Sequence, residues 1–386
     1  MLRKIRLTVA IFFFVLITLL FLDFTGTLHG WFDWMAKIQF LPALLALNVG
    51  VVIALIVLTL LLGRVYCSVI CPLGVFQDVV SWLGKKRKKN RYSYSPALNW
   101  LRYGVLGVFI LALIGGVGSL VALLAPYSSY GRIASNLFAP VYQWGNNLLA
   151  YLAERADSYM FYSVDVWMKA AGTFAIAALT FAVLAVLAWR TYCNTICPVG
   201  TVLGFLSRFS LLKPVIDTSK CNGCGLCARN CKAACIDPKA HKIDYSRCVA
   251  CMDCIGKCKK GAIRYERPRK ETQQPVTAGK VNSVPPEQVD NARRAFFSAG
   301  AVFATNALLK AQEKKVDGGL AVIEDKKIPK RTTPIFPAGS LGARNFTQHC
   351  TACQLCVSVC PNQVLRPSGN LMTLMQPEMS YERGYC

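Results

Sequence analysis

Eight cysteines in the middle of the chain follow one spacing twice. The spacing is CxxCxxCxxxC, and its copies are Cys221, Cys224, Cys227 and Cys231, then Cys248, Cys251, Cys254 and Cys258. Three cysteines this close together can bind three corners of a [4Fe-4S] cluster, and in two-cluster ferredoxins the fourth cysteine of each motif binds the other cluster. The spacing therefore predicts two [4Fe-4S] clusters in residues 214–266.

The predicted ligand sets are interleaved. The first is Cys221, Cys224, Cys227 and Cys258, and the second is Cys248, Cys251, Cys254 and Cys231. Short strand-like stretches between and after the motifs suit an α+β ferredoxin-like module. Zinc is the alternative metal, but a third close cysteine favours a cubane. Cys235 is predicted to be a buried spare thiol, and Lys232 and Lys259 stand where ferredoxins usually carry Pro.

A third copy of the spacing, "CTACQLCVSVCP", occurs near the end of the sequence. Its cysteines are Cys350, Cys353, Cys356 and Cys360. By itself this copy supplies three ligands for a third cluster and one, Cys360, for a neighbouring cluster. No companion motif follows before the sequence stops on Cys386. We therefore expect a partial ferredoxin-like domain over residues 346–386, either as part of a longer chain or with Cys360 or Cys386 closing the third cluster.

Two further cysteine pairs belong to an internal repeat. "RVYCSVICPLG", from Arg64 to Gly74, returns as "RTYCNTICPVG", from Arg190 to Gly200, and the cysteines are Cys67, Cys71, Cys193 and Cys197. If the repeats pack face to face, four thiolates converge on one metal or cluster. Thiol redox chemistry and buried structural thiols are the other two interpretations. Arg64 and Arg190 either neutralise thiolate charge or anchor the chain at lipid headgroups.

Each CxxxCP motif follows an apolar run. Four runs, Ile5 to Leu22, Phe40 to Leu62, Trp100 to Ala125 and Trp167 to Ala188, approach or exceed the roughly 20 residues that a transmembrane helix needs. They predict an α-helical membrane bundle of four transmembrane helices in two repeats over residues 1–213. The segments beginning at Pro72 and Pro198 are predicted to be surface or half-inserted helices.

Charge and composition support this class of protein. The 386 residues have a mean hydropathy of +0.38 and a net charge of +24. Basic residues flank alternate apolar runs, which places both cysteine pairs on the cytoplasmic side. The 18 cysteines occur mostly in metal-type clusters, which must stay reduced while they are loaded. No basic stripe interleaved with aromatic residues occurs, so nucleic acid is not an expected partner.

Residues 267–345 have the composition of a linker, with one apolar segment inside it. Arg293 and Arg294 precede that segment, as in twin-arginine export signals. Export would carry the Cys350 region to the periplasm. Alternatively, the segment is a surface helix and everything after Arg190 stays inside.

The combination of four spans, paired CxxxCP motifs and a two-cluster module resembles a known family. Residues 1 to about 265 are similar to membrane polyferredoxins of the NapH, NosR and CcoG type, which include quinol dehydrogenase-like proteins. From Arg293 onward the chain looks like the NapG or MauM type of ferredoxin, so the whole resembles a fusion of the two. The resemblance implies a multi-pass protein of the bacterial inner membrane, in contact with lipid and with its ferredoxin module on the cytoplasmic side.

The same resemblance implies a function. Electrons would pass from quinol through two, or with the Cys350 region three, [4Fe-4S] clusters to a redox partner, such as a reductase or a multihaem cytochrome. The chain would then be a candidate subunit of a quinol dehydrogenase. The alternative is a copper reductase or assembly factor for a respiratory enzyme, in which the CxxxCP pairs bind an additional metal.

Overall fold

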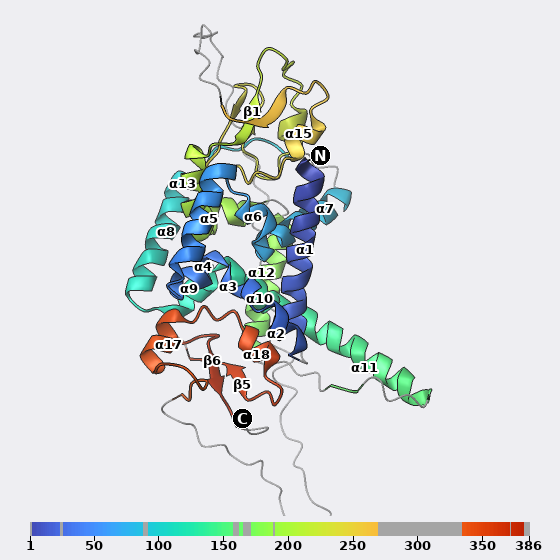
Figure 1. Cartoon of the computed structure of the whole chain (residues 1–386), viewed down its shortest axis with the longest axis vertical. Coiled ribbons are helices and arrows are strands. Elements are labelled where there is room, and N and C mark those ends of the chain that lie inside the picture. The colour runs from blue at the N-terminus through green and yellow to red at the C-terminus, as the bar shows by residue number, and fades with distance from the viewer. Residues whose placement is uncertain are drawn as a thin grey trace, which may run out of the picture. The chain divides into compact units, whose positions relative to one another are not determined.

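The computed structural model describes residues 2–23, 26–87, 92–156, 162–164, 171–187, 190–268, 334–370 and 372–381 (Figure 1). The chain divides into one compact unit, Met1–Arg269 with Thr333–Cys386, and a second unit, Lys270–Thr332. The fold described below is that of the first unit. Arg293, Arg294 and Cys386 lie outside the described residues, and so do residues 269–333 of the predicted linker.

The N-terminal part is helical. Up to the second cysteine pair its helices are α1 (Leu2–Leu22), α2 (Thr27–Phe32), α3 (Trp34–Lys37), α4 (Phe40–Leu45), α5 (Val49–Leu62), α6 (Tyr66–Val69), α7 (Pro72–Arg87), α8 (Asn99–Ile114), α9 (Gly118–Leu124), α10 (Pro126–Ile133), the π-turn η1 (Ala134–Phe138), α11 (Ala139–Arg155) and α12 (Ala171–Leu187). The second pair is followed by α13 (Pro198–Leu206) and a short 3₁₀ turn, η3 (Ser207–Phe209). Cys193 lies in a second π-turn, η2 (Tyr192–Ile196).

One helix among the described residues, α1, is long and apolar enough to cross a membrane. Two of the other predicted spans are wrong as continuous helices. Phe40 to Leu62 is broken into α4 and α5, and Trp100 to Ala125 is broken into α8 and α9. The fourth predicted span overlaps α12, but its ends lie outside the described residues.

Both breaks have local causes. At the first, Leu47 has a φ of 53°, and the Asn48 side chain accepts a hydrogen bond from the Val51 backbone N–H at 3.4 Å, which caps α5. At the second, Gly116 has a φ of 69°, and the Val117 N–H donates to the Ala112 carbonyl at 2.9 Å. This is a glycine-terminated helix end. An apolar composition is the same on both sides of such a break, so hydropathy does not reveal it.

The two helices after the cysteine pairs begin as predicted. Pro72 and Pro198 are the first residues of α7 and α13, where a missing N–H has no cost. Their predicted position at the surface is wrong for the first turns, because Leu73, Phe76 and Val199 are buried in the core. The two repeats are therefore packed inside the unit.

The first two cysteine motifs form a small α+β module. Its elements are β1 (Lys213–Ile216), α14 (Leu226–Arg229), β2 (Ile236–Asp237), β3 (Lys242–Ile243), α15 (Asp253–Lys257) and β4 (Ile263–Glu266). β1 pairs antiparallel with β4, and β2 with β3. The predicted short strands are confirmed, and the β1–β4 pair brings the two ends of the module together.

The third cysteine region has α17 (Ala343–His349), α18 (Leu355–Val359), β5 (Leu365–Pro367) and β6 (Pro377–Met379). Its two strands are antiparallel, with Leu365 opposite Met379. The order of motif, short helix and strand after the cysteines is the same as in each half of the first module. This region therefore repeats the element order of one half of that module.

α1 contacts both cysteine-rich parts (Figure 1). At its first turn Arg3 forms an ion pair of 2.7 Å with Asp253 of α15. At its other end α1 packs against α18, and Gly26, just beyond the helix, approaches Val359 of α18. A helix of 21 residues is about 30 Å long, so the two parts meet α1 at ends separated by roughly that length.

Candidate iron–sulfur sites

Two pockets of the ferredoxin-like module are lined by the interleaved cysteine sets. The first contains Cys221, Cys224, Cys227 and Cys258. The second contains Cys231, Cys248, Cys251 and Cys254, together with Cys235. The fourth cysteine of each motif thus lies with the first three cysteines of the other motif. This crossing follows from the packing of α14 against α15.

The three cysteine loops share one backbone shape. The residues on either side of the second cysteine have φ values between 49° and 68°, and they are Gly223 and Gly225, Ala250 and Met252, and Ala352 and Gln354. In the second and third loops these are L-residues in a left-handed conformation, which is rarely adopted without compensation. Left-handed residues that alternate with ordinary ones turn successive N–H groups inward and form concave anion-binding nests, which iron–sulfur sites use. The donor set and the loop shape fit a thiolate-ligated anionic cluster.

Cys235 was predicted to be a buried spare thiol, and it is only 1% exposed. Its Sγ lies 3.5 Å from Cys231 Sγ, and it also lines the second pocket. The sequence did not indicate this contact with a candidate ligand.

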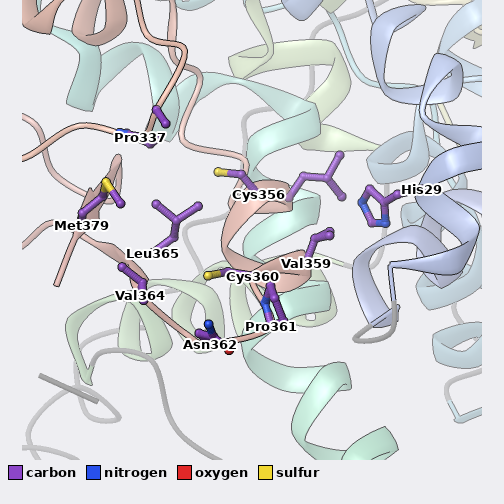
Figure 2. Close-up of a pocket in the computed structure, with 12 residues that line it drawn as sticks. His29, Pro337, Cys356, Val359, Cys360, Pro361, Asn362, Val364, Leu365 and Met379 are labelled. Carbon is purple, nitrogen blue, oxygen red and sulfur yellow. The ribbon is translucent and has the colours of Figure 1, made fainter. Parts of the chain in front are cut away.

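The third cysteine region has an open apolar pocket (Figure 2). Cys356 and Cys360 line it, and their sulfur atoms point toward Leu365 and Met379. His29 also lines this pocket, beyond Val359, with its Nδ1 3.3 Å from Asp23 Oδ2. The segment from Cys360 to Leu365 borders this pocket as the segment from Cys258 to Ile263 borders the first one.

The Cys353 loop docks on the helical part. An added Cβ at Gly131 of α10 would lie 2.4 Å from the Cys353 carbonyl oxygen, so the loop and the helix touch through their backbones. Asn136 Nδ2 donates to Gln354 Oε1 at 3.0 Å, and both side chains are buried. The region is therefore fixed on α10 and η1 as well as on α1.

The four cysteines of the CxxxCP motifs are all buried. Cys67 lies in α6, Cys193 lies in η2, and Cys71 and Cys197 each precede a helix-starting proline. The interpretation of Arg64 and Arg190 as anchors at lipid headgroups is wrong, because both side chains are fully buried. Arg64 donates to the Cys193 carbonyl at 3.1 Å, and Arg190 donates to the Cys67 carbonyl at 3.0 Å. Each repeat's arginine therefore holds the first cysteine of the other repeat.

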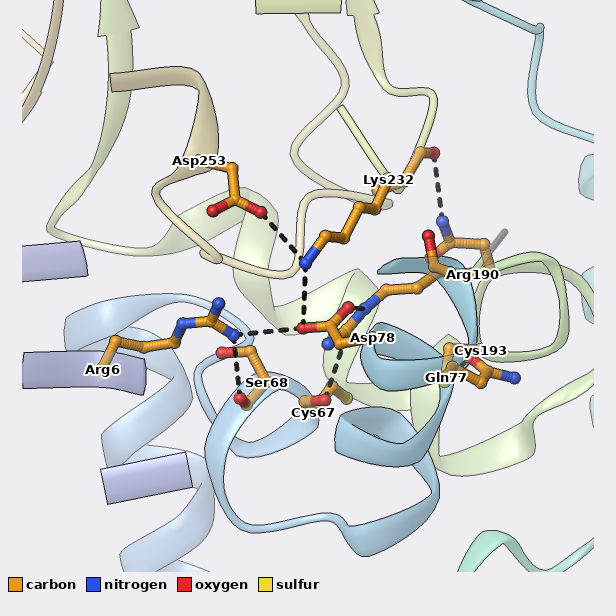
Figure 3. Close-up of polar contacts among 12 residues, drawn as sticks. Arg6, Cys67, Ser68, Gln77, Asp78, Arg190, Cys193, Lys232 and Asp253 are labelled. Atoms are coloured by element: carbon orange, nitrogen blue, oxygen red, sulfur yellow. Dashed lines mark hydrogen bonds and ion pairs between the residues drawn. The ribbon is translucent and has the colours of Figure 1, made fainter. Parts of the chain in front are cut away.

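A buried carboxylate, Asp78 of α7, joins this site to the ferredoxin-like module (Figure 3). Its oxygens lie 2.8 Å from Arg190 Nε, 3.2 Å from Arg6 Nη1 and 3.6 Å from Lys232 Nζ. Lys232 also pairs with Asp253 at 3.2 Å. Burial by itself would raise the pKa of Asp78, but the charge of Arg190, aided by Lys232 and Arg6, outweighs it and holds that pKa well below its usual value.

The sequence analysis did not identify Asp78 as part of the site, although the sequence contains a feature that could have indicated it. It is the acidic residue in an otherwise apolar and polar-neutral stretch, "PLGVFQDVVSWLG", and the second repeat has Gly204 at the corresponding position. Because only the first repeat has an acidic residue at this position, the difference marks a side chain whose role the second repeat does not share.

Among the described residues, no three His, Cys, Asp or Glu side chains lie close enough together to hold a single metal ion.

Comparisons with known proteins point to iron–sulfur binding in general. A family model described as "4Fe-4S binding domain" matches residues 44–91 and 170–216, once on each CxxxCP repeat. The ferredoxin-type protein NapH of Haemophilus influenzae is 29% identical over 195 residues, which are 50% of this chain and 56% of the relative. The methylamine utilization ferredoxin-type protein MauN of Methylobacillus flagellatus is 27% identical over 170 residues, 44% of this chain and 48% of the relative.

The putative electron transport protein YccM of Escherichia coli is 28% identical over 196 residues, 50% of this chain and 47% of the relative. The chain spans about half the length of the curated relatives that it matches. No solved structure matches the chain. The repeated 4Fe-4S match and the named relatives, which include the regulatory protein NosR of Stutzerimonas stutzeri, show that the chain is similar to ferredoxin-type proteins of the NapH and NosR type, and they support iron–sulfur electron transfer in general.

Proposed function

We propose that this chain is a membrane-bound quinol dehydrogenase subunit that takes electrons from quinol and passes them to a respiratory reductase or another redox partner, such as a multihaem cytochrome. The observation that carries the proposal is the interleaving of two four-cysteine sets, each lining one pocket. This is the ligand pattern of a two-cluster ferredoxin, in which two carriers lie close enough to exchange electrons.

We assign one set of four cysteines to each of the two clusters. Cys221, Cys224, Cys227 and Cys258 hold one [4Fe-4S] cluster, and Cys231, Cys248, Cys251 and Cys254 hold the other. In the third region Cys350, Cys353 and Cys356 are the proposed ligands of a third cluster, and Cys360 lines the same pocket as Cys356. When bound, such clusters accept and release single electrons with little structural change.

Cations of the chain surround the second ligand set. Arg247 donates to the Ala233 carbonyl at 3.2 Å, and Lys232 lies between Asp78 and Asp253. Nearby positive charge favours the reduced, more negative form of a cluster and therefore raises its potential. These residues hold the cysteine loops in place and set the electrostatic field around them.

We propose further that four apolar segments cross the membrane, namely α1, α4 with α5, α8 with α9, and α12. Large apolar side chains are exposed along them, including Trp100, Leu111 and Ile114 of α8, each at least 69% exposed. An apolar surface of this extent is unfavourable in water and favourable in lipid. Broken helices at membrane depth are tolerated where their free backbone groups are satisfied by the protein.

The contacts of α1 favour opposite sides for the two cysteine-rich parts. The ferredoxin-like module meets the Arg3 end and the Cys350 region meets the other end, which are about 30 Å apart, the thickness of the hydrocarbon core. With basic residues at the Arg3 end, that end is cytoplasmic and the Cys350 region is periplasmic. A reporter enzyme fused after residue 381 tests this, because one that is active only after export should then be active, and an inactive reporter would contradict the assignment.

The function is tested by anaerobic EPR on the purified full chain in detergent, titrated with a reduced quinol. We expect cluster signals to appear as quinol is added and to be absent with the oxidised quinone. Clusters that dithionite reduces but quinol does not would contradict the proposed donor. Copper bound in stoichiometric amount, with no reduction by quinol, would favour the copper-handling alternative.

A further inference from the structure

We propose that Arg132 of α10 is the counter-charge of the third cluster, so that the Cys350 region supplies the thiolates and the helical part supplies a buried guanidinium beside them. The inference rests on one part of the proposed function, namely the cluster at Cys350, Cys353 and Cys356. It adds a residue that lies outside every cysteine motif. This residue raises the potential of the third cluster and makes the helical part a component of that redox site.

The guanidinium of Arg132 bridges two helices inside the unit. Arg132 is only 1% exposed. Its Nη1 donates to the Ala122 carbonyl of α9 at 2.9 Å, and its Nη2 donates to Ser129 Oγ at 3.0 Å. Its Nε is buried and has no hydrogen-bond partner among the described residues. The positive charge is therefore held in a fixed place, away from water.

The same two helices contact the Cys353 loop. Ala122, which accepts from Arg132, packs with Ala352 in one buried cluster. Gly131 directly precedes Arg132, and an added Cβ there would lie 2.4 Å from the Cys353 carbonyl oxygen. One helix thus touches the residue before Cys353, and the other touches Cys353 itself.

A third contact comes from η1. Asn136 Nδ2 donates to the Arg132 carbonyl at 2.9 Å and to Gln354 Oε1 at 3.0 Å, and all three residues are buried. Each of the consecutive residues 352–354 therefore contacts a group that is bonded to Arg132 or next to it in the chain. The cysteine loop and the arginine are packed as one local structure.

Arg132 has no carboxylate partner in the part of the chain that the structure describes, because none of its ion pairs involves this residue. The equally buried Arg190, by contrast, pairs with Asp78 at 2.8 Å. The Ala122 carbonyl lies in the last turn of α9, and a helix end carries only about half a unit charge. A buried cation without a full counter-charge is strongly unfavourable.

A cluster at the Cys353 loop would remove this imbalance. Neutral thiols supply no charge, whereas a thiolate-ligated cluster is an anion that becomes more negative on reduction. A fixed cation beside it favours the reduced form and raises the potential. The clusters proposed for the ferredoxin-like module are too far away for this role, because that module meets α1 at the Arg3 end and the Cys350 region meets the other end.

The test is an EPR redox titration of the full chain, purified in detergent without oxygen and reduced chemically. The signal that Cys353→Ala removes is that of the third cluster. Arg132→Gln should lower the ratio of reduced to oxidised third cluster at a fixed potential on the order of tenfold, which is about 59 mV for one electron. Arg132→Lys keeps the charge and should keep most of the potential.

Arg102→Gln is the matched control. Arg102 is also buried, but it donates to Ser246 of the ferredoxin-like module. Its replacement should therefore leave the potential of the third cluster unchanged.

Thermal unfolding separates charge from packing. With the cluster bound, Arg132→Gln removes its counter-charge and should lower the midpoint temperature of unfolding. In the Cys353→Ala background the arginine is already unbalanced, so the same substitution should be less destabilising there. A residue that only packs would change both midpoint temperatures by the same amount, and that result would count against the inference.

The remaining outcomes are also decisive. Equal potentials in the wild type, Arg132→Gln and Arg132→Lys, or a shift confined to another cluster's signal, would overturn the inference. So would loss of the third cluster from both Arg132 variants, or a wild type without a signal that Cys353→Ala removes. Loss from Arg132→Gln alone would support it. Because the titration uses a chemical reductant, a chain that quinol does not reduce contradicts only the proposed electron donor.

Discussion

Arg190 and Asp78 form a largely buried ion pair, with 2.8 Å between Nε and Oδ1, that links the loop before the second cysteine pair to the helix after the first. The two residues are 112 positions apart in the chain. Removing one partner of such a pair leaves a charge uncompensated in the interior, which typically costs about 3–5 kcal/mol.

Asp78→Asn should therefore lower the free energy of unfolding by about 3–5 kcal/mol, because Arg190 and Arg6 would lose their counter-charge. Thermal unfolding of the chain in detergent measures the effect. Asp33→Asn is the control, since its ion pair with Lys37 is about half exposed and should contribute less than about 1 kcal/mol. Equal effects of the two substitutions would show that burial of the Asp78 pair is unimportant.

The depressed pKa of Asp78 predicts a specific acid sensitivity. In the unfolded chain this carboxyl takes up a proton near pH 4, whereas in the folded chain it does so only at lower pH. Its contribution to stability is therefore fully present above about pH 5 and is lost as the pH falls below about 4. The stability difference between wild type and Asp78→Asn, measured against pH, should shrink on acidification. A difference that stays constant down to pH 3 would refute the assignment.

The interleaved ligand sets predict crossed effects of substitution. Cys231→Ser and Cys254→Ser should abolish the same EPR signal and remove about four irons each, while Cys258→Ser should affect the other signal. The Cys231→Ser/Cys254→Ser double variant should lose no more iron than either single variant. If Cys231→Ser instead behaves like Cys227→Ser, the motifs bind their clusters separately and the crossing is wrong.

The contact between Cys235 and Cys231 predicts a shift in potential. A thiol that donates to a ligand sulfur stabilises the reduced cluster, and one such hydrogen bond of about 1 kcal/mol corresponds to about 40 mV for a single electron. Cys235→Ala should lower the midpoint potential of the second cluster by roughly this amount, as followed by an EPR redox titration. Cys235→Ser keeps a donor and should restore most of it. Identical midpoint potentials in the wild type, Cys235→Ala and Cys235→Ser would show that Cys235 only fills space beside the cluster site.

The glycines after the CxxxCP motifs predict a steric limit. An added Cβ would lie 2.1 Å from the Cys67 carbonyl oxygen at Gly74 and 2.3 Å from the Cys193 carbonyl oxygen at Gly200. Gly74→Ala and Gly200→Ala should each destabilise the chain by at least about 1–3 kcal/mol, because the clash is with backbone. Gly104→Ala, where a Cβ meets open space, should be neutral or stabilising. Thermal unfolding compares the three, and tolerance at Gly74 would contradict the close packing.

Local features were predicted well from the sequence. The strands that follow the cysteine motifs, and the helices that begin at Pro72 and Pro198, depend on residues a few positions apart, and the structure confirms them. The cysteine spacing is local in the same sense, because each motif of eleven residues, such as Cys221 to Cys231, limits which of its sulfurs can lie together. The assignment of each cysteine to a cluster remains a prediction.

Features that depend on distant residues were not predicted. The breaks at Leu47 and Gly116 lie in runs whose composition is continuous, and the burial of Arg64 has no local sign, since a basic residue after an apolar run also suits a headgroup anchor. The sequence by itself determined which candidate ligands this protein has and how they are spaced, because ligand chemistry and loop geometry are local. Only the tertiary structure decided that Asp78 would meet Arg6, Arg190 and Lys232, and that each arginine would hold the other repeat, because charges separated along the chain are brought together by packing alone.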